Sequence, residues 1–315
     1  MAVGAVGLLD FSVEDEESEE HPNHYPSDYP GDYSSDDAAQ QDHAEIDVIS
    51  GTDVSEEIRG SDGIDRVGGY GGDDTVSTGA GNDELVGMDG ADSLDGGAGD
   101  DTLRGGAGHD ILQGGDGADT LYGHEDDDSL HGGAHADTLH SGTGNDVADG
   151  EDGDDAVHGG LGDDTVRGGA GDDTLFGGYG DDMIDGREGA GEGGDFLNGG
   201  DGDDTIIADA GDVVTSGEGA DAIVTGAELS DDRAVHIMDF DAQADNIVLL
   251  WDDADGGDMP DVALEPAADG SGNMQVLMDG VVVASVDASA ELTMDDIALV
   301  PHSFAAANGL VPSAA

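Results

Sequence analysis

The strongest constraint on this chain is a nine-residue repeat that occupies residues 60–207. Each block reads Gly-Gly-x-Gly-x-Asp-x-apolar-x, as residues 105–113 (GGAGHDILQ) illustrate. The residue two places after the aspartate is a branched aliphatic in thirteen of fourteen consecutive blocks, which neither an acidic linker nor a solvated acidic surface explains. So strict a period predicts a solenoid, in which one structural unit is stacked many times.

The block pattern also predicts the path of the backbone within each coil. The glycines permit a tight turn with backbone angles that other residues avoid. The last three residues form a short strand with the aliphatic side chain pointing inward. Two blocks complete one coil, so residue n lies beneath residue n+18 at a strand spacing of about 4.8 Å. We therefore predict an all-β fold, a parallel β-roll or β-helix solenoid of nonapeptide repeats.

This stacking brings the sixth-place aspartates together in columns, where neighbouring carboxylates repel unless a cation lies between them. Calcium suits such a site because it takes six to eight oxygen ligands at about 2.3–2.6 Å, which carboxylates and glycine carbonyls supply. Magnesium demands a tighter octahedron, and zinc lacks nitrogen and sulfur ligands here. Two columns of seven give six neighbouring pairs each, so we expect up to about a dozen Ca²⁺ ions. The predicted metal ligands are Asp65, Asp74, Asp83, Asp92, Asp101, Asp110, Asp119, Asp128, Asp137, Asp146, Asp155, Asp164, Asp173, Asp182, Asp195 and Asp204.

Three departures from the repeat fall close together in the sequence. Asp126 and His135 replace the fourth-place glycine of their blocks. Aspartate and histidine are among the residues that best tolerate positive φ, so we expect both turns to survive under strain. Ala148 replaces the core aliphatic and leaves a small void. Calcium sites near residues 124–150 are therefore predicted to be the weakest.

The repeat loses its phase once, directly after Asp182. The segment 186–194 delays the next sixth-place aspartate to Asp195, four residues late, and Asp204 then follows at the normal interval. We interpret this segment as a loop that bulges from one coil.

Composition changes along the chain divide it into four parts. Asp279-Gly280 separates two alternating apolar runs and is a strong hairpin signal. The acidic N-terminal stretch shows no apolar periodicity and is expected to be disordered. The predicted parts are a disordered acidic tail (1–50), a calcium-binding β-roll (51–224), an antiparallel β capping domain (225–300) and a flexible C-terminal tail (301–315).

The charge of the chain restricts its partners and couples its folding to a ligand. The formal net charge is −71, with 77 acidic residues against six basic ones. No basic patch exists to bind nucleic acid or an anionic membrane, and no apolar stretch is long enough to span a bilayer. Such a charge opposes a compact state, and the core is thin. We therefore expect the chain to be disordered without calcium and to fold when calcium binds.

The repeats resemble the RTX, or haemolysin-type, calcium-binding repeats. Residues 101–119 (DTLRGGAGHDILQGGDGAD) match that family's signature, and residues 236–250 (HIMDFDAQADNIVLL) resemble the segment that closes many such repeat domains. The resemblance implies a parallel β-roll, calcium bound by the sixth-place aspartates and glycine carbonyls, and an extracellular protein that is either secreted or associated with the cell surface. It also implies export through a type I secretion apparatus. A protein partner is not indicated.

No catalytic motif emerges from the sequence, and we do not expect an enzyme. His124-Glu125 begins like a zinc-protease HExxH motif, but Asp128 occupies the last place and the stretch lies in the repeat. The 50 residues before the repeats are too few for a catalytic domain. Two functions remain open: a secreted, non-catalytic structural protein, or an accessory module of a secreted enzyme or toxin (protease, lipase or haemolysin) whose catalytic part is missing from this chain.

Overall fold

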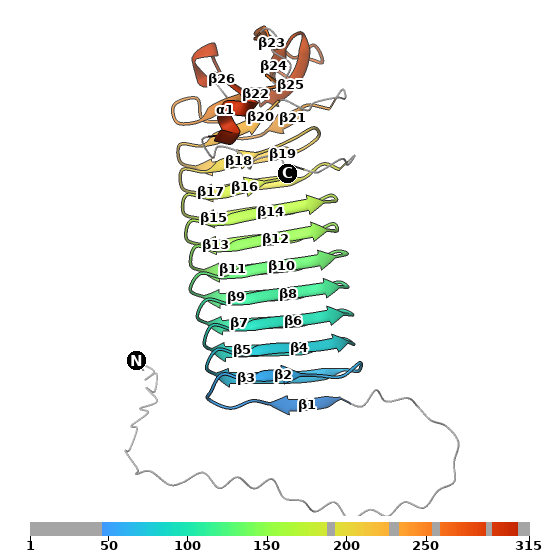
Figure 1. Ribbon diagram of the computed structural model, residues 1–315. Coiled ribbons are helices and arrows are strands. Elements are labelled where there is room, and N and C mark those ends of the chain that lie inside the picture. Colours follow the sequence, from blue (N-terminus) through green and yellow to red (C-terminus); the bar gives the residue numbers. More distant parts are fainter. Residues whose placement is uncertain (1–45, 188–192, 227–232, 254–258, 288–291, 308–315) are drawn as a thin grey trace, which may run out of the picture. The chain divides into compact units, whose positions relative to one another are not determined.

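The computed structural model describes residues 46–187, 193–226, 233–253, 259–287 and 292–307. Within these ranges the fold is nearly all β and forms a parallel solenoid of about ten coils, which confirms the predicted fold class. Up to Trp251, successive strands alternate between two sheets, so each coil contributes one strand to each sheet (Figure 1). Short glycine-containing turns connect the two sheets at both edges of the stack.

The bounds of the strands follow the nine-residue blocks. In spatial order, the 14-stranded sheet contains β1 (Asp47–Ser50), β3 (Asp65–Gly71), β5 (Glu84–Asp89), β7 (Thr102–Ala107), β9 (Thr120–Glu125), β11 (Thr138–Thr143), β13 (Ala156–Leu161), β15 (Thr174–Tyr179), β17 (Phe196–Asp201), β19 (Val213–Glu218), β21 (Val235–Ile237), β25 (Val281–Val286), β24 (Met274–Met278) and β23 (Val262–Pro266). The 12-stranded sheet contains β2 (Glu57–Arg59), β4 (Thr75–Ala80), β6 (Ser93–Ala98), β8 (Ile111–Asp116), β10 (Ser129–Ala134), β12 (Val147–Asp152), β14 (Thr165–Ala170), β16 (Met183–Asp185), β18 (Thr205–Ile207), β20 (Ala222–Thr225), β22 (Asn246–Trp251) and β26 (Ile297–Pro301).

The register between coils is the predicted one. Thr120 of β9 pairs with Thr102 of β7 on one side and with Thr138 of β11 on the other, so partners lie eighteen residues apart. The eighth-place aliphatics point into the narrow space between the two sheets, where Leu103 and Leu121 are fully buried. Each such side chain contributes about 1.5–3 kcal/mol through burial. The core is therefore one aliphatic column on each sheet, and the fold depends strongly on its turns.

The loop insertion after Asp182 is confirmed by a change in register. Thr165 pairs with Met183 at a separation of eighteen residues, whereas Met183 pairs with Thr205 at twenty-two. The four additional residues are thus accommodated in one coil, and the parallel pairing continues on both sides. Residues 188–192 of the insertion lie outside the described residues.

The C-terminal strands extend the solenoid before they close it. The strands β21 and β22 continue the two sheets in parallel, and β25 and β26 add one further parallel strand to each. Among the described residues, antiparallel pairing is confined to β23, β24 and β25, so the antiparallel part seen there is smaller than the predicted 225–300. The predicted hairpin is confirmed: Asp279 and Gly280 have φ values of 53° and 83°, as its two-residue turn requires.

Both predicted tails contain residues that the structure places in regular elements. The strand β1 pairs with β3 in the solenoid register, four residues before the predicted boundary. The segment predicted as a loose C-terminal tail contains α1 (His302–Ala307), which directly follows β26. The 3₁₀ turn η1 (Met294–Asp296) directly precedes β26. Ala305 of α1 packs with Val224 and Leu250, which explains why this segment is held. The rest of the two tails, residues 1–45 and 308–315, lies outside the described residues.

Candidate metal centre

The sixth-place aspartates form two buried columns, one at each turn edge of the stack. All are at most 4% exposed, which is unusual for ionisable side chains. The sequence-predicted residues all take the expected places in these columns. The first column contains Asp74, Asp92, Asp110, Asp128, Asp146, Asp164, Asp182, Asp204, Asp221 and Asp245, and the second contains Asp65, Asp83, Asp101, Asp119, Asp137, Asp155, Asp173, Asp195 and Asp212.

A hydrogen-bond ladder holds each carboxylate in its column. The backbone N–H of Asp101 donates to Oδ1 of Asp119 at 2.7 Å, and the N–H of Asp119 donates to Oδ1 of Asp137 at 2.7 Å. The same bond recurs from coil to coil along both columns, across the insertion as well, where Asp182 donates to Asp204 at 2.8 Å. One oxygen of every aspartate after Asp65 is therefore fixed by the neighbouring coil, whereas Asp65, at the start of its column, accepts the backbone N–H of Ser61 at 2.8 Å.

The second oxygen, Oδ2, is buried but has no hydrogen-bond donor in most of the aspartates. A buried carboxylate oxygen without a donor is costly, because it loses its hydration and gains nothing in return. Because this donor-free oxygen recurs in coil after coil, it is a feature of the repeat itself, and a bound cation would compensate its lost hydration. The residues concerned are Asp74, Asp83, Asp92, Asp101, Asp110, Asp119, Asp128, Asp137, Asp146, Asp155, Asp164, Asp182, Asp204 and Asp221.

The first-place glycines leave room for these oxygens. A Cβ atom on Gly159 would lie 2.5 Å from Oδ2 of Asp164 and 2.6 Å from the carbonyl oxygen of Gly177. A Cβ atom on Gly132 would likewise lie 2.5 Å from Oδ2 of Asp137 and 2.8 Å from the carbonyl oxygen of Gly150. The absence of a side chain thus lets a carboxylate oxygen and a carbonyl oxygen from the next coil approach the same place.

The electrostatics of the columns favour a bound cation. Burial, together with the charges of Asp119 and other neighbouring carboxylates, raises the pKa of Asp101 to about 7, against the lowering effect of its backbone hydrogen bond. Burial also raises the pKa values of Asp137 and Asp155 to about 7 for the same reasons. Without a cation, these carboxylates bind protons near neutral pH. A divalent ion offsets both the lost hydration and the repulsion.

The donor set fits calcium better than other ions. Within the part of the chain that the structure describes, no three histidine or acidic side chains gather around one point. Backbone carbonyl oxygens must therefore complete the coordination, beside one or two carboxylates. Calcium accepts this mixture of carboxylate and carbonyl oxygens in irregular geometry, and when bound it supplies positive charge to the columns. The residues that would hold it are the sixth-place aspartates and the glycines of the turns.

Three column members escaped the sequence prediction as metal ligands. Asp212 and Asp221 follow Asp195 and Asp204 at seventeen residues, because the block between Asp204 and Asp212 is one residue short. Asp245 follows Asp221 at twenty-four residues and receives its backbone N–H at 3.2 Å. A signal is present in the sequence, because Asp212 and Asp221 follow the repeat loosely and all three aspartates precede a buried aliphatic by two places. Their altered spacing kept them out of the predicted ligand set.

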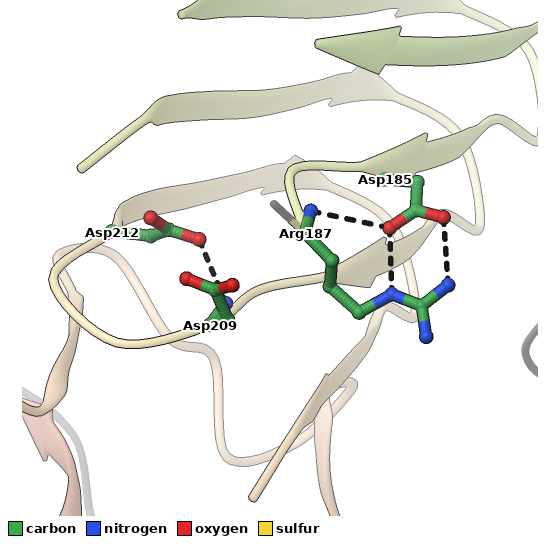
Figure 2. Close-up of polar contacts among 4 residues, drawn as sticks. All are labelled: Asp185, Arg187, Asp209 and Asp212. Atoms are coloured by element: carbon green, nitrogen blue, oxygen red, sulfur yellow. Dashed lines mark hydrogen bonds and ion pairs between the residues drawn. The ribbon is translucent and has the colours of Figure 1, made fainter. Parts of the chain in front are cut away.

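The second column ends differently from the coils before it. Oδ2 of Asp212 accepts a hydrogen bond from the backbone N–H of Asp209 at 2.8 Å (Figure 2). Figure 2 also shows how the insertion leaves its coil: the guanidinium of Arg187 binds both carboxylate oxygens of Asp185 at 2.8 Å. Each of these contacts uses a protein group to satisfy a carboxylate where the regular repeat is interrupted.

The substituted turns keep the geometry of the repeat. Asp126 and His135 adopt φ values of 73° and 83°, so the predicted strained turns are confirmed. The ladder remains continuous beside them, with Asp128 donating to Asp146 at 2.7 Å. Reduced calcium affinity in this region therefore stays a prediction that rests on backbone strain. His124 also has a positive φ, of 87°, and lies at the end of β9, not on a helix, as its interpretation as a repeat variant requires.

Comparison with known proteins agrees with this geometry. The family model for the RTX calcium-binding nonapeptide repeat matches residues 50–85, 78–112, 104–134, 131–166, 158–191 and 190–223. No match to a curated protein was found for the chain. The described residues contain no helix that is both long and apolar enough to cross a bilayer. The matches together cover more than half of the 315 residues, so the chain belongs to the family of RTX calcium-binding nonapeptide repeat proteins, whose many repeats imply multiple calcium sites.

Proposed function

We propose that this chain is a secreted, non-catalytic structural protein that folds when calcium binds along its two aspartate columns. The observation that carries the proposal is the recurring buried Oδ2 atom without a hydrogen-bond donor. Folding without a cation would bury this atom in coil after coil, at about 1–3 kcal/mol for each unsatisfied group. Calcium converts this cost into a favourable interaction, so binding and folding occur as one event.

The proposal extends to where the protein works. Extracellular calcium modules bind their ion at about 10⁻⁴–10⁻³ M, a concentration far above that of free calcium in the cytoplasm. A chain that folds only in this range stays unfolded inside the cell, which suits export through a type I secretion apparatus. Membership of the RTX family supports an extracellular location. Up to about a dozen ions are proposed for the fourteen in-phase aspartates, at one for each neighbouring pair.

Circular dichroism during a calcium titration tests the proposal on the full chain. We expect a disordered spectrum in chelator and a cooperative gain of β signal near 10⁻⁴–10⁻³ M calcium. Magnesium at equal concentration serves as the control for ionic strength and charge screening, and it is expected to leave most of the chain unfolded. A chain that already shows the full β signal in chelator at neutral pH would contradict calcium-linked folding.

A further inference from the structure

The C-terminal end of the first column is built unlike the coils before it. Asp221 is fully buried and Asp245 is 3% exposed, yet Asp245 lies outside the nonapeptide phase and beyond the matched residues 50–223. It belongs to the loop that precedes β22, the strand that continues the 12-stranded sheet after the last repeat. The column thus extends into the closing part of the chain through one side chain.

The carboxylates of Asp221 and Asp245 are direct neighbours at the end of the column. Their side chains lie within hydrogen-bonding reach, and the backbone N–H of Asp221 donates to Oδ1 of Asp245 at 3.2 Å. Oδ2 of Asp221 has no hydrogen-bond donor, although the side chain is fully buried. No ion pair among the described residues includes Asp221 or Asp245. Two buried carboxylates in contact require a cation or a proton between them.

A hydroxyl group lies beside this pair where the repeat has a glycine. Ser216 takes the first place of its block, and its Oγ lies 3.2 Å from Oδ2 of Asp245 and 3.3 Å from Oδ1 of Asp239. Asp239 fixes this serine further, because its carboxylate accepts the backbone N–H groups of Ser216 at 2.8 Å and Gly217 at 3.2 Å. Oδ2 of Asp245 also accepts the N–H of Asp241 at 2.7 Å, which aims the carboxylate at Ser216.

The corresponding end of the second column is closed by a backbone group. There, the N–H of Asp209 donates to Oδ2 of Asp212 and satisfies it with a protein group (Figure 2). At the first column the last carboxylates instead meet a second carboxylate and a hydroxyl oxygen. The difference between the two ends shows that the fold is able to close a column without a cation, and that it does not do so at Asp221.

We propose that Asp221, Asp245 and Ser216 form an additional calcium site that joins the closing segment to the solenoid. Asp239 acts as a positioning residue, because it holds Ser216 without facing Asp221. The oxygens come from carboxylates and a hydroxyl on separate segments, which suits a large, hard dication of flexible coordination. The site rests on the proposed function, since it continues a column that binds the same ion. Its occupancy fixes Asp245 and, through it, the start of β22.

The test uses the full chain and its single tryptophan. Trp251 is the last residue of β22, so its fluorescence reports on the closing segment, whereas far-UV circular dichroism reports mainly on the many coils. Asp245→Asn is expected to raise the calcium midpoint of the Trp251 signal about tenfold, the effect of removing one charged ligand. The midpoint of the circular dichroism signal should change less than about twofold, and equilibrium dialysis with radioactive calcium should show one ion fewer at concentrations that saturate the coils.

A matched control and a milder variant complete the design. Asp279→Asn removes the same charge from the β24–β25 turn and keeps the oxygen that accepts the Asp261 N–H, so it should change neither midpoint. Ser216→Ala removes only the hydroxyl and should shift the Trp251 midpoint in the same direction as Asp245→Asn, by a smaller factor. If Asp245→Asn and Ser216→Ala both leave the Trp251 midpoint and the ion count unchanged, the additional site is wrong. If the wild-type chain gains no β signal in calcium, the proposed function itself fails.

Discussion

At the residue scale, the first-place glycines decide whether a coil can hold both oxygens that face a calcium ion. The exclusion is steric and not conformational, because Gly159 has no positive φ and is restricted only by Asp164 and Gly177. Thr78 and Ser141 occupy the same place in other blocks and are buried there. Both coils keep the eighteen-residue register, and the hydroxyl of Thr78 donates to the carbonyl oxygen of Gly96 in the next coil at 2.8 Å.

Replacement of Gly159 by alanine tests this steric reading. The new Cβ atom would overlap Oδ2 of Asp164 and the carbonyl of Gly177. Because overpacking a close-packed site costs about 1–3 kcal/mol, we expect a loss of this size in denaturant unfolding at saturating calcium. The control is Gly68→Ala, whose Cβ would meet only Tyr70 at 3.6 Å, with an expected change within about 0.5 kcal/mol. Equal losses in both variants would rule out the oxygen cradle as the cause.

At the fourth place of the block we predict a gain in stability when a residue with a side chain is replaced by glycine, because the backbone there has a positive φ. His135 has a φ of 83°, which costs a residue with a Cβ atom about 1–2 kcal/mol. His135→Gly removes this strain but loses about 0.5–1 kcal/mol through backbone entropy. We therefore expect a net gain of about 0.5–1 kcal/mol in thermal or denaturant unfolding. Ala136→Gly, at an exposed neighbour without a positive φ, should instead be neutral or destabilising, and a gain there would refute the explanation.

At the element scale, the outer face of the 14-stranded sheet carries a ladder of stacked rings. Tyr122, His140, His158 and Phe176 are direct partners on successive strands, β9 to β15. Their ring centroids lie 5.2, 4.9 and 4.6 Å apart with interplanar angles of 15°, 17° and 0°. The guanidinium of Arg104 lies over the Tyr122 ring at 5.5 Å. The ladder stabilises neighbouring coils through their outer face, where calcium plays no part.

The two histidines of the ladder should titrate unusually. Burial lowers the pKa of His140, and burial together with the charge of His140 lowers the pKa of His158. Because the folded pKa lies below the unfolded value near 6.5, the ladder is fully stabilising above that pH and loses stability as the pH falls through it. His140→Phe keeps the stack but removes the charge, so the pKa of His158 should rise in an NMR titration. His131→Phe on the other sheet should leave it unchanged, and an unaltered His158 pKa in both variants would contradict the coupling.

At the scale of the whole molecule, the carboxylates that we propose as calcium ligands are also the ones that protons bind. The pKa values of Asp101, Asp137 and Asp155 are raised to about 7 in the metal-free fold, above their unfolded value of 3.8. The folded state therefore binds more protons between these pH values. Its stability without calcium is greatest below the unfolded pKa and is lost as the pH rises through about 7. The net charge of −71 acts in the same direction, because acidification reduces it.

Metal-free protein should consequently show more β signal at pH 5 than at pH 8. Calcium has to displace the protons that the carboxylates bind at low pH. The calcium concentration at the folding midpoint should therefore be higher at pH 5.5 than at pH 8. Circular dichroism after dialysis against metal-free buffer measures the first effect, and calcium titration at each pH measures the second. The triple variant Asp101→Asn, Asp137→Asn, Asp155→Asn should reduce the pH dependence, whereas an exposed pair, Asp89→Asn and Asp116→Asn, should not. A wild-type chain whose metal-free β signal is independent of pH would refute this linkage.

Much of the site was predictable because the repeat encodes it locally. The aspartate and the aliphatic two places later assign each block its turn, its strand and its inward face, so the eighteen-residue register follows without any tertiary information. The insertion after Asp182 and the Asp279-Gly280 hairpin were predictable for the same reason, since both are changes within a few consecutive residues. The sequence alone thus determined the solenoid, its thin core and most members of the two columns.

Only the tertiary structure decided what happens where the period fails. Asp212, Asp221 and Asp245 join the columns through spacings of seventeen and twenty-four residues, which no local pattern specifies. The fixed Oδ1 atom and the donor-free Oδ2 atom likewise depend on the neighbouring coil, because the donor to Oδ1 lies eighteen residues away along the chain. A period defines contacts between identical coils, whereas the ends of the columns are defined by segments of different sequence that meet only after folding.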